Sequence, residues 1–230
     1  MQLLAKGVWQ LAGFPRHWFN VYLVEDVLID AATRWAKRRI LKQLANHSLR
    51  MVALTHCHPD HQGAARVVCE KFNVPLACHE ADAPAVEGRV SMLPQNRVIR
   101  LGQWIWAGPP CLVKRLLRDG DDVAGFQVVH APGHTPGHIL FFRAADRVAI
   151  VGDLLFNVNF LTGRTGLGEP PAIFSADKAE NRRSIQTLVD LKPNLVCFGH
   201  GPPLRNPELL EQFLARRAIL PAPVLNPTCG

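Results

Sequence analysis

The stretch Thr55-His56-Cys57-His58-Pro59-Asp60-His61 reads His-x-His-x-Asp-His, so four side chains of metal-binding type fall within six residues. The apolar run Met51-Val52-Ala53-Leu54 precedes it and predicts a strand, and the residues after Gln62-Gly63 have helix character. We therefore expect the motif in a strand-to-helix loop, where side chains can converge while the flanking elements hold them in place. Imidazole and carboxylate groups are suitable ligands for zinc, iron or manganese.

Three more residues of the same chemical type follow strand-like runs elsewhere in the chain. His134 lies in a turn rich in Gly and Pro, Asp153 follows Gly152 after the apolar run 148–151, and His200 follows Gly199 after the run 195–198. Open sheets bind ligands beyond the carboxyl ends of their strands. We therefore expect these residues to meet the histidine motif at one edge of a sheet.

These motifs resemble those of the metallo-β-lactamase superfamily, in its glyoxalase II-like or lactonase-like branch. The resemblance runs from about Leu4 to Arg217 and includes Asp30, which ends the strand-like run Leu28-Ile29. It implies an α/β fold, a four-layer αββα sandwich, formed by a single domain over residues 1–230.

The resemblance also implies two divalent metal ions, with zinc expected first and iron or manganese as alternatives. One ion would be held by His56, His58 and His134, the other by Asp60, His61 and His200, and Asp153 would bridge the two. Asp30 would orient a ligand without binding metal. Asp60 would also have a catalytic role, orienting the nucleophile.

This ligand set predicts a hydrolase. Two ions about 3.5–4 Å apart can share a water and lower its pKa towards about 7, and the resulting hydroxide can attack a carbonyl carbon. The leading hypothesis is hydrolysis of a thioester, a lactone or another activated ester. One alternative is a persulfide dioxygenase with a single iron on His56, His134 and Asp153. A phosphodiesterase or nuclease is a further alternative, which the net charge of +7 favours slightly.

Departures from the resemblance narrow the substrate. True β-lactamases of this superfamily usually carry Cys or Ser where Asp153 stands. Lactone hydrolases carry Tyr three positions after the bridging Asp, and this chain has Phe156 there. Glyoxalase II continues into a helical domain that binds glutathione, whereas about thirty residues follow His200 in this sequence. Each departure argues against one narrow assignment.

Two segments are candidate walls of the substrate site. After Asp153, the residues Phe156, Asn157 and Arg164 could contact substrate, and His138 is expected near the centre. The segment 83–125 holds several prolines together with Trp104 and Trp106, and we expect an irregular insertion that serves as a lid or substrate wall. In a strand the two tryptophans would share a face. A core contact or a dimer surface is the alternative.

Composition and periodicity frame these expectations. Apolar residues make up 48% of the chain, and no run approaches the roughly 18 needed to span a membrane. The six cysteines form no Cys-x-x-Cys pair, which favours reduced thiols and a cytoplasmic location. We expect a small-molecule substrate, no nucleic acid and no membrane, and leave a homodimer open. Periodicity predicts strands at 21–24, 27–29, 52–54, 74–78, 126–130, 139–142, 148–151 and 195–198, and helices at 32–45, 60–72, 177–191 and from Asn206 onward.

Overall fold

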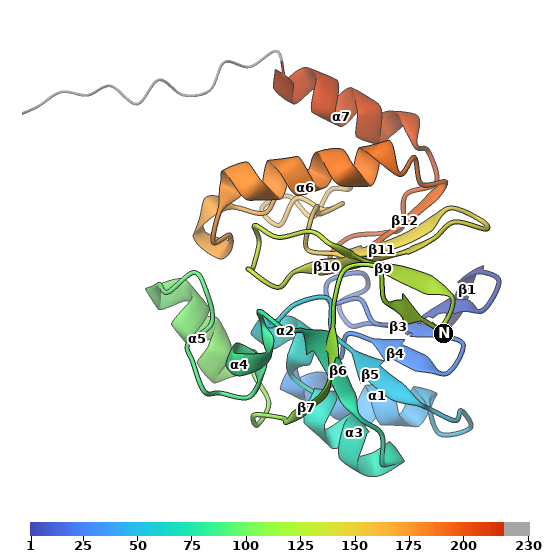
Figure 1. Cartoon of the computed structure of the whole chain (residues 1–230), viewed down its shortest axis with the longest axis vertical. Coiled ribbons are helices and arrows are strands. Elements are labelled where there is room, and N and C mark those ends of the chain that lie inside the picture. The colour runs from blue at the N-terminus through green and yellow to red at the C-terminus, as the bar shows by residue number, and fades with distance from the viewer. Residues whose placement is uncertain (219–230) are drawn as a thin grey trace, which may run out of the picture.

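Two β-sheets pack face to face in the computed structural model, which describes residues 1–218 (Figure 1). The first sheet has seven strands in chain order: β1 (Gln2–Ala5), β2 (Val8–Gln10), β3 (Tyr22–Val24), β4 (Val27–Ile29), β5 (Met51–Ala53), β6 (Leu76–His79) and β7 (Val113–Leu117). Strands β1 to β4 pair antiparallel, whereas β4 to β7 pair parallel.

The second sheet has five strands in the order β12-β11-β10-β9-β8. Their bounds are β8 (Asp122–Val123), β9 (Phe126–His130), β10 (Ile139–Arg143), β11 (Val148–Gly152) and β12 (Leu195–Phe198). All pairs are antiparallel except β11 with β12. The parallel pair brings the ends of β11 and β12 to the same edge of the sheet, and Asp153 and His200 follow those two ends.

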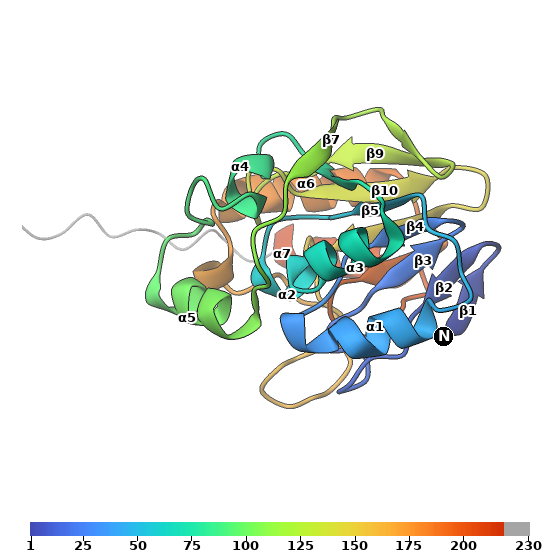
Figure 2. The ribbon, with the colours of Figure 1, turned by 90° about the horizontal axis from the view of Figure 1, so that it is seen from below.

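Helices cover the outer faces of both sheets and complete four layers. Helices α1 (Lys37–Gln43) and α3 (Ala65–Phe72) lie against the first sheet, and α6 (Lys178–Asp190) and α7 (Glu208–Ala218) lie on the side of the second (Figures 1 and 2). The αββα sandwich implied by the family resemblance is confirmed. No helix in the described part of the chain is long and apolar enough to cross a bilayer.

Alternation along the strands builds three buried layers. Within β10, Ile139 and Phe141 face the core between the sheets, whereas Leu140 and Phe142 face the layer under α6. Similarly, Leu28 packs towards α1 and its neighbour Ile29 packs between the sheets. Successive side chains of a strand point to opposite faces, so a strand buried on both faces is apolar throughout.

Two predicted helices are shorter or divided in the structure. The helix expected over 32–45 does not start at Ala32, because Ala32 has φ +50°, which a right-handed helix does not accommodate. It begins instead with the 3-10 turn η1 (Arg34–Ala36). The helix expected over 60–72 is divided into α2 (Pro59–Gln62) and α3 around Gly63. A Cβ at Gly63 would lie 2.3 Å from the backbone nitrogen of Arg34, so this junction packs directly on η1.

The segment 83–125 is ordered secondary structure, contrary to the expectation of an irregular insertion. It contains α4 (Ala83–Val86), α5 (Arg97–Trp106), β7 and β8. Asn96 begins α5 by accepting hydrogen bonds from the amides of Val98 and Ile99, both at 2.9 Å. Trp104 and Trp106 therefore lie in a helix and share no strand face. The segment also supplies one edge strand to each sheet.

Candidate metal centre

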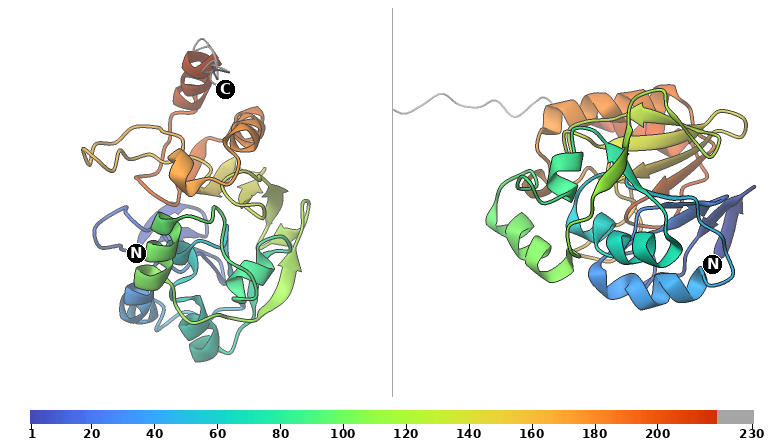
Figure 3. Two further views of the ribbon diagram at one scale, coloured as in Figure 1. Left: turned by 90° about the vertical axis from the view of Figure 1, so that its left-hand side faces the viewer. Right: turned by 60° about the horizontal axis from the view of Figure 1, so that its bottom comes forward.

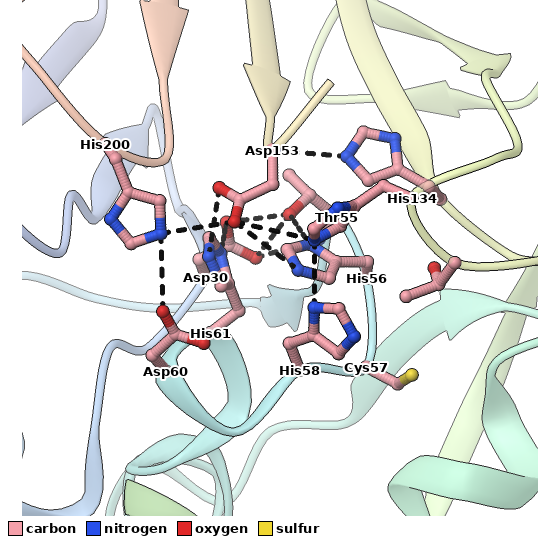
Figure 4. A network of polar contacts seen from close by, with 12 residues as sticks. Asp30, Thr55, His56, Cys57, His58, Asp60, His61, His134, Asp153 and His200 are labelled. Carbon is pink, nitrogen blue, oxygen red and sulfur yellow. Dashed lines mark hydrogen bonds and ion pairs between the residues drawn. The ribbon is translucent and has the colours of Figure 1, made fainter. Parts of the chain in front are cut away.

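The predicted ligands converge at one end of the sandwich, where loops from both sheets meet (Figure 4). The first sheet delivers the histidine motif between β5 and the first turn of α2. The second sheet delivers His134 from the turn between β9 and β10, Asp153 after β11 and His200 after β12. All are buried except Asp60, whose side chain is 14% exposed.

The donor atoms form three overlapping groups, and within each group they lie within 4.8 Å of one another. The groups are His56, His58 and His134; His56, His61 and Asp153; and Asp60, His61 and His200. The first and third are the two ligand triads expected from the sequence. The structure thus brings together all seven residues that the resemblance named.

Asp30 fixes two of these imidazoles from behind. Its Oδ2 accepts a hydrogen bond from His61 Nδ1 at 2.8 Å and another from the Thr55 hydroxyl at 2.9 Å. Because the Thr55 hydroxyl donates to Asp30, its oxygen can accept from His56 Nδ1, which lies 3.0 Å away. Both rings consequently present Nε2 to the centre. The expectation that Asp30 orients ligands agrees with these contacts.

The rings of His58 and His134 are anchored by groups that sequence patterns do not reveal. His58 Nε2 donates to the backbone carbonyl of Leu93 at 2.8 Å, which turns Nδ1 inward. His134 Nδ1 lies 3.5 Å from the Ser175 hydroxyl, which turns Nε2 inward. These two inner nitrogens are 2.8 Å apart. Two lone pairs at that distance repel each other unless a proton or a metal cation lies between them.

His200 is held through its backbone and its ring. Its Nδ1 donates to the carbonyl of Trp18. Its backbone carbonyl accepts from the Asn157 amide at 2.9 Å, and the Asn157 side chain donates to the carbonyl of Pro202 at 2.8 Å. Asn157 therefore supports the His200 loop. Its role in substrate binding stays a prediction.

Asp153 reaches both halves of the centre. Its Oδ2 lies 3.1 Å from His200 Nε2 and 3.6 Å from His134 Nε2, and its Oδ1 lies 3.2 Å from His61 Nε2. The backbone N–H of Asp153 donates a hydrogen bond to His138 Nε2 at 3.1 Å. The His138 imidazole, acting as a neutral acceptor, therefore positions the Asp153 residue. Burial lowers the pKa of His138 to about 3, which keeps the ring neutral.

The inward-facing atoms fit divalent metal ions. His56 Nε2 is buried and makes no hydrogen bond to any residue that the structure describes, and the buried His61 Nε2 and Asp153 Oδ1 lie 3.2 Å apart. A buried polar group without a partner costs about 1–3 kcal/mol, so His56 Nε2 beside these two atoms indicates a bound cation as the missing partner. The nitrogen and oxygen donors are those that zinc, iron and manganese accept.

The charges of the centre lead to the same conclusion. Burial lowers the pKa of His56 and of His134 well below the usual imidazole value, so both rings are neutral at pH 7 and can offer a lone pair to a metal ion. Burial also opposes protonation of His200, but Asp153 and Asp60 outweigh it and raise the pKa of His200 to about 10. Without a metal, this ring carries a proton beside the carboxylates. A divalent cation would replace that positive charge and release the proton.

Asp82 also supports the centre, although the sequence analysis did not identify it. Its carboxylate is buried and accepts from the Cys57 amide at 2.9 Å, the Thr135 hydroxyl at 2.7 Å and the Gly137 amide at 2.7 Å. It thereby ties the histidine motif to the His134 turn. Its position just after β6 repeats the strand-end placement of the ligands, and that signal could have identified it.

Aromatic rings line the outer side of His200. The rings of Phe156, Phe160 and Phe19 have centroids 4.9, 5.3 and 5.7 Å from the imidazole, and Trp18 stacks edge-on against Phe160 at 5.7 Å. Phe156 was expected beside the site and lies there. Arg164 is exposed in the same loop, and its side chain makes no ion pair with the described residues. Its role in substrate binding stays a prediction.

Comparison with known proteins agrees with this geometry. The probable metallo-hydrolase YybB of Bacillus subtilis (strain 168) is 30% identical over 209 residues, covering 88% of each chain. The hydroxyacylglutathione hydrolase GloC of Haemophilus influenzae is 31% identical over 161 residues, covering 67% of this chain and 69% of that protein. The crystal structure of TTHA1623 in a di-iron-bound form superimposes with a TM-score of 0.67 at 32% identity, covering 84% of this chain and 92% of that one.

The family assignment follows from the match over most of the chain. Residues 20–200 match the metallo-β-lactamase superfamily, and this range contains every residue of the three donor groups. TTHA1623 shares the fold, and the relatives named above include a probable metallo-hydrolase and a hydroxyacylglutathione hydrolase. The chain belongs to the metallo-β-lactamase superfamily.

Proposed function

We propose that this protein is a metal-dependent hydrolase with two divalent ions, acting on a thioester, a lactone or another activated ester. One observation carries the proposal: Asp153 reaches both ligand triads while the ligand rings turn unpartnered donors inward. The likeness to GloC, named a hydroxyacylglutathione hydrolase, supports thioester chemistry. The di-iron form of TTHA1623 supports a centre with two ions.

The proposed ligands divide as the geometry suggests. His56 Nε2, His58 Nδ1 and His134 Nε2 would hold one ion, and Asp60, His61 Nε2 and His200 Nε2 the other, with Asp153 shared. Zinc is proposed first, with iron or manganese as alternatives. When bound, two such ions make hydroxide available near neutral pH and polarise the carbonyl that it attacks.

The protein's own residues position the reactants. The Asp60 carboxylate lies 3.3 Å from His200 Nε2 and is the most exposed of the seven, so it can accept a hydrogen bond from the attacking water and orient it. Phe156 and Phe160 form an apolar wall beside His200 that excludes water from the reacting carbonyl. Phe156 offers no hydroxyl group to a substrate, so we place thioesters ahead of lactones.

The first experiment is metal content per chain, on protein expressed with zinc, iron and manganese all available. We expect about two ions per chain and turnover of a thioester in a panel of thioesters and lactones. His58→Ala and Asp153→Ala should remain folded and lose turnover, whereas His47→Ala, at an exposed histidine, should keep it. Unchanged turnover in the first two variants would refute the site.

The same experiment distinguishes the proposed hydrolase from the main alternative. A persulfide dioxygenase would bind a single iron, on His56, His134 and Asp153 as the sequence resemblance suggests. An iron content near one per chain, together with oxygen uptake on adding a persulfide, would replace the hydrolase proposal.

A further inference from the structure

The segment 88–112 carries an exposed apolar surface with no acidic residue. Its 25 residues contain three arginines and no Asp or Glu. Large apolar side chains exposed there are Val90, Leu93, Val98, Leu101, Trp104, Trp106 and Leu112. Trp104 is 74% exposed and Leu101 is 56% exposed, and large apolar side chains exposed on one helix mark an interaction site. We name the exposed apolar side chains of α5, which are Val98, Leu101, Trp104 and Trp106, together with Trp35, the α5 surface.

The pattern of α5 explains how the surface forms. Ile99 and Gly102 are buried against the body of the protein, whereas Val98, Leu101 and Trp104 follow one another at three-residue steps on the outer side. Arg97 and Arg100 are exposed on the same helix. The helix therefore presents apolar and cationic side chains together, as helices that lie in a membrane interface do.

Trp35 from η1 extends the surface. It is 68% exposed, and its indole Nε1 donates to the carbonyl of Ile105 at 3.0 Å, which joins η1 to the end of α5. The guanidinium of Arg34 lies over the Trp35 ring, 4.7 Å from its centroid. Tryptophan and arginine are the side chains that anchor proteins at the headgroup level of a bilayer.

The charge of the α5 surface indicates which kind of partner binds there. Arg97 and Arg100 form no ion pair with any residue in the described part of the chain. A second copy docked on the same patch would set arginine against arginine with no acid in 88–112 to compensate, because a two-fold contact uses the same surface on both sides. We infer that the α5 surface docks on an anionic lipid bilayer, with its apolar side chains among the acyl chains and its arginines at the headgroups.

The dimensions fit a helix lying in the interface. Helix α5 has ten residues and is about 15 Å long, half of the roughly 30 Å of a bilayer core. It lies at the outer end of the molecule in two perpendicular views, and Figure 3 (left) looks onto that end (Figures 1 and 2). Docking there leaves the two sheets and the helices that cover them in water.

The surface adjoins the candidate metal centre. The Leu93 carbonyl holds His58, and Gly102 lies over Pro59, the residue between the two halves of the histidine motif. This adjacency points to a substrate class, an inference that rests on the proposed function. The substrates would be amphiphilic thioesters or esters with a long acyl chain, taken from the lipid surface. The docking itself does not depend on that function.

The test is vesicle binding by the metal-loaded protein. Flotation is measured with vesicles of phosphatidylcholine alone and of phosphatidylcholine mixed with phosphatidylglycerol. We expect binding to the anionic vesicles that falls as salt increases, with a blue shift of tryptophan emission. Leu101→Ser should weaken it about tenfold, through lost apolar burial. Arg97→Gln should weaken it about fivefold, equivalent to about 1 kcal/mol per arginine. Leu3→Ser is the matched control, since Leu3 is 53% exposed on β1 and should bind as the wild type does.

Each outcome decides the inference. Absence of vesicle binding, or equal loss in Leu3→Ser, would overturn it. A dimer in solution that dissociates in Leu101→Ser would assign the surface to a second copy, and selective binding of a soluble acidic protein without vesicle binding would assign it to that class of partner. Vesicle binding without ester or thioester turnover would leave the docking intact and refute the proposed function. Turnover of a soluble thioester without vesicle binding would leave the proposed function intact and refute the docking.

Discussion

Replacing Asp30 by Asn tests whether the anchoring network sets metal affinity. Asp30 Oδ1 accepts from the Thr55 amide at 2.8 Å, and Oδ2 accepts from the Thr55 hydroxyl and from His61 Nδ1. An amide has one oxygen. Whichever way it turns, its NH₂ group faces at least one of these donors, and a bond to a carboxylate is lost.

The magnitude follows from the nature of that bond. A hydrogen bond to a charged acceptor contributes about 1.5–3 kcal/mol, which is a tenfold or larger effect on an equilibrium constant. Changes behind metal-binding histidines reduce metal affinity about 10–100-fold. Because Asp30 holds His61 directly and His56 through Thr55, Asp30→Asn should weaken both metal-binding steps.

The assay is competition with a chelator, followed by elemental analysis of each step of metal loss. Thr55→Val is the discriminating variant: it keeps the Asp30–His61 contact and removes the acceptor of His56 Nδ1, so it should weaken only the step that involves His56. Asp26→Asn is the matched control, on an exposed aspartate paired with Arg50. Wild-type metal retention by a folded Asp30→Asn protein would refute the reasoning.

Three further predictions concern residues around the centre. Asp82→Asn should destabilise the protein by about 2–4 kcal/mol in urea unfolding, because an amide at that position faces a backbone N–H or the Thr135 hydroxyl in either orientation; a loss below 1 kcal/mol would contradict this. Gly199→Ala should abolish metal retention and turnover, since the added Cβ would lie 2.1 Å from Asp153 Oδ1, while Gly166→Ala, with open space around it, should retain both. Cys111 should be the first cysteine to be alkylated in a Cys229→Ser background. A hydrogen bond from the Cys69 thiol lowers the pKa of Cys111, so more thiolate is present at neutral pH. Burial raises the pKa of Cys57 and brings the pKa of Cys197 to about 12. Equal labelling of Cys111 and Cys197 in the folded protein would show that this environment is wrong.

The donor set of the centre could be predicted from the sequence because its chemistry is local. Three histidines and an aspartate fall in one short stretch, and Asp153 and His200 each follow an apolar strand and a glycine. A strand end fixes where the next side chain lies relative to the sheet edge, so strand positions predicted these residues at one edge, and the family resemblance assigned them to two metal sites. The alternation within β10 likewise places its residues on two faces, as period two requires.

The sequence pattern was misleading over 83–125. Four prolines and Gly102 resemble the punctuation of an irregular loop. The structure forms α5 there because Asn96 caps the helix and Ile99 packs into the core. The expectation of no membrane contact rested on the absence of a spanning run, and that criterion does not address a short helix lying in the interface.

By itself, the sequence indicated the metal-binding side chains at strand ends and a layered α/β architecture, since motif spacing and strand periodicity are properties of the chain. The division of the ligands between two ions and the four-layer sandwich were implied by the family resemblance. Only the tertiary structure decided how the rings are turned. His58 and His200 are anchored by the backbone carbonyls of Leu93 and Trp18, and every residue has such a carbonyl, so no residue type signals the contact. The exposure of Trp104 was decided in the same way, because a helix has an outer face only after its inner face has been packed.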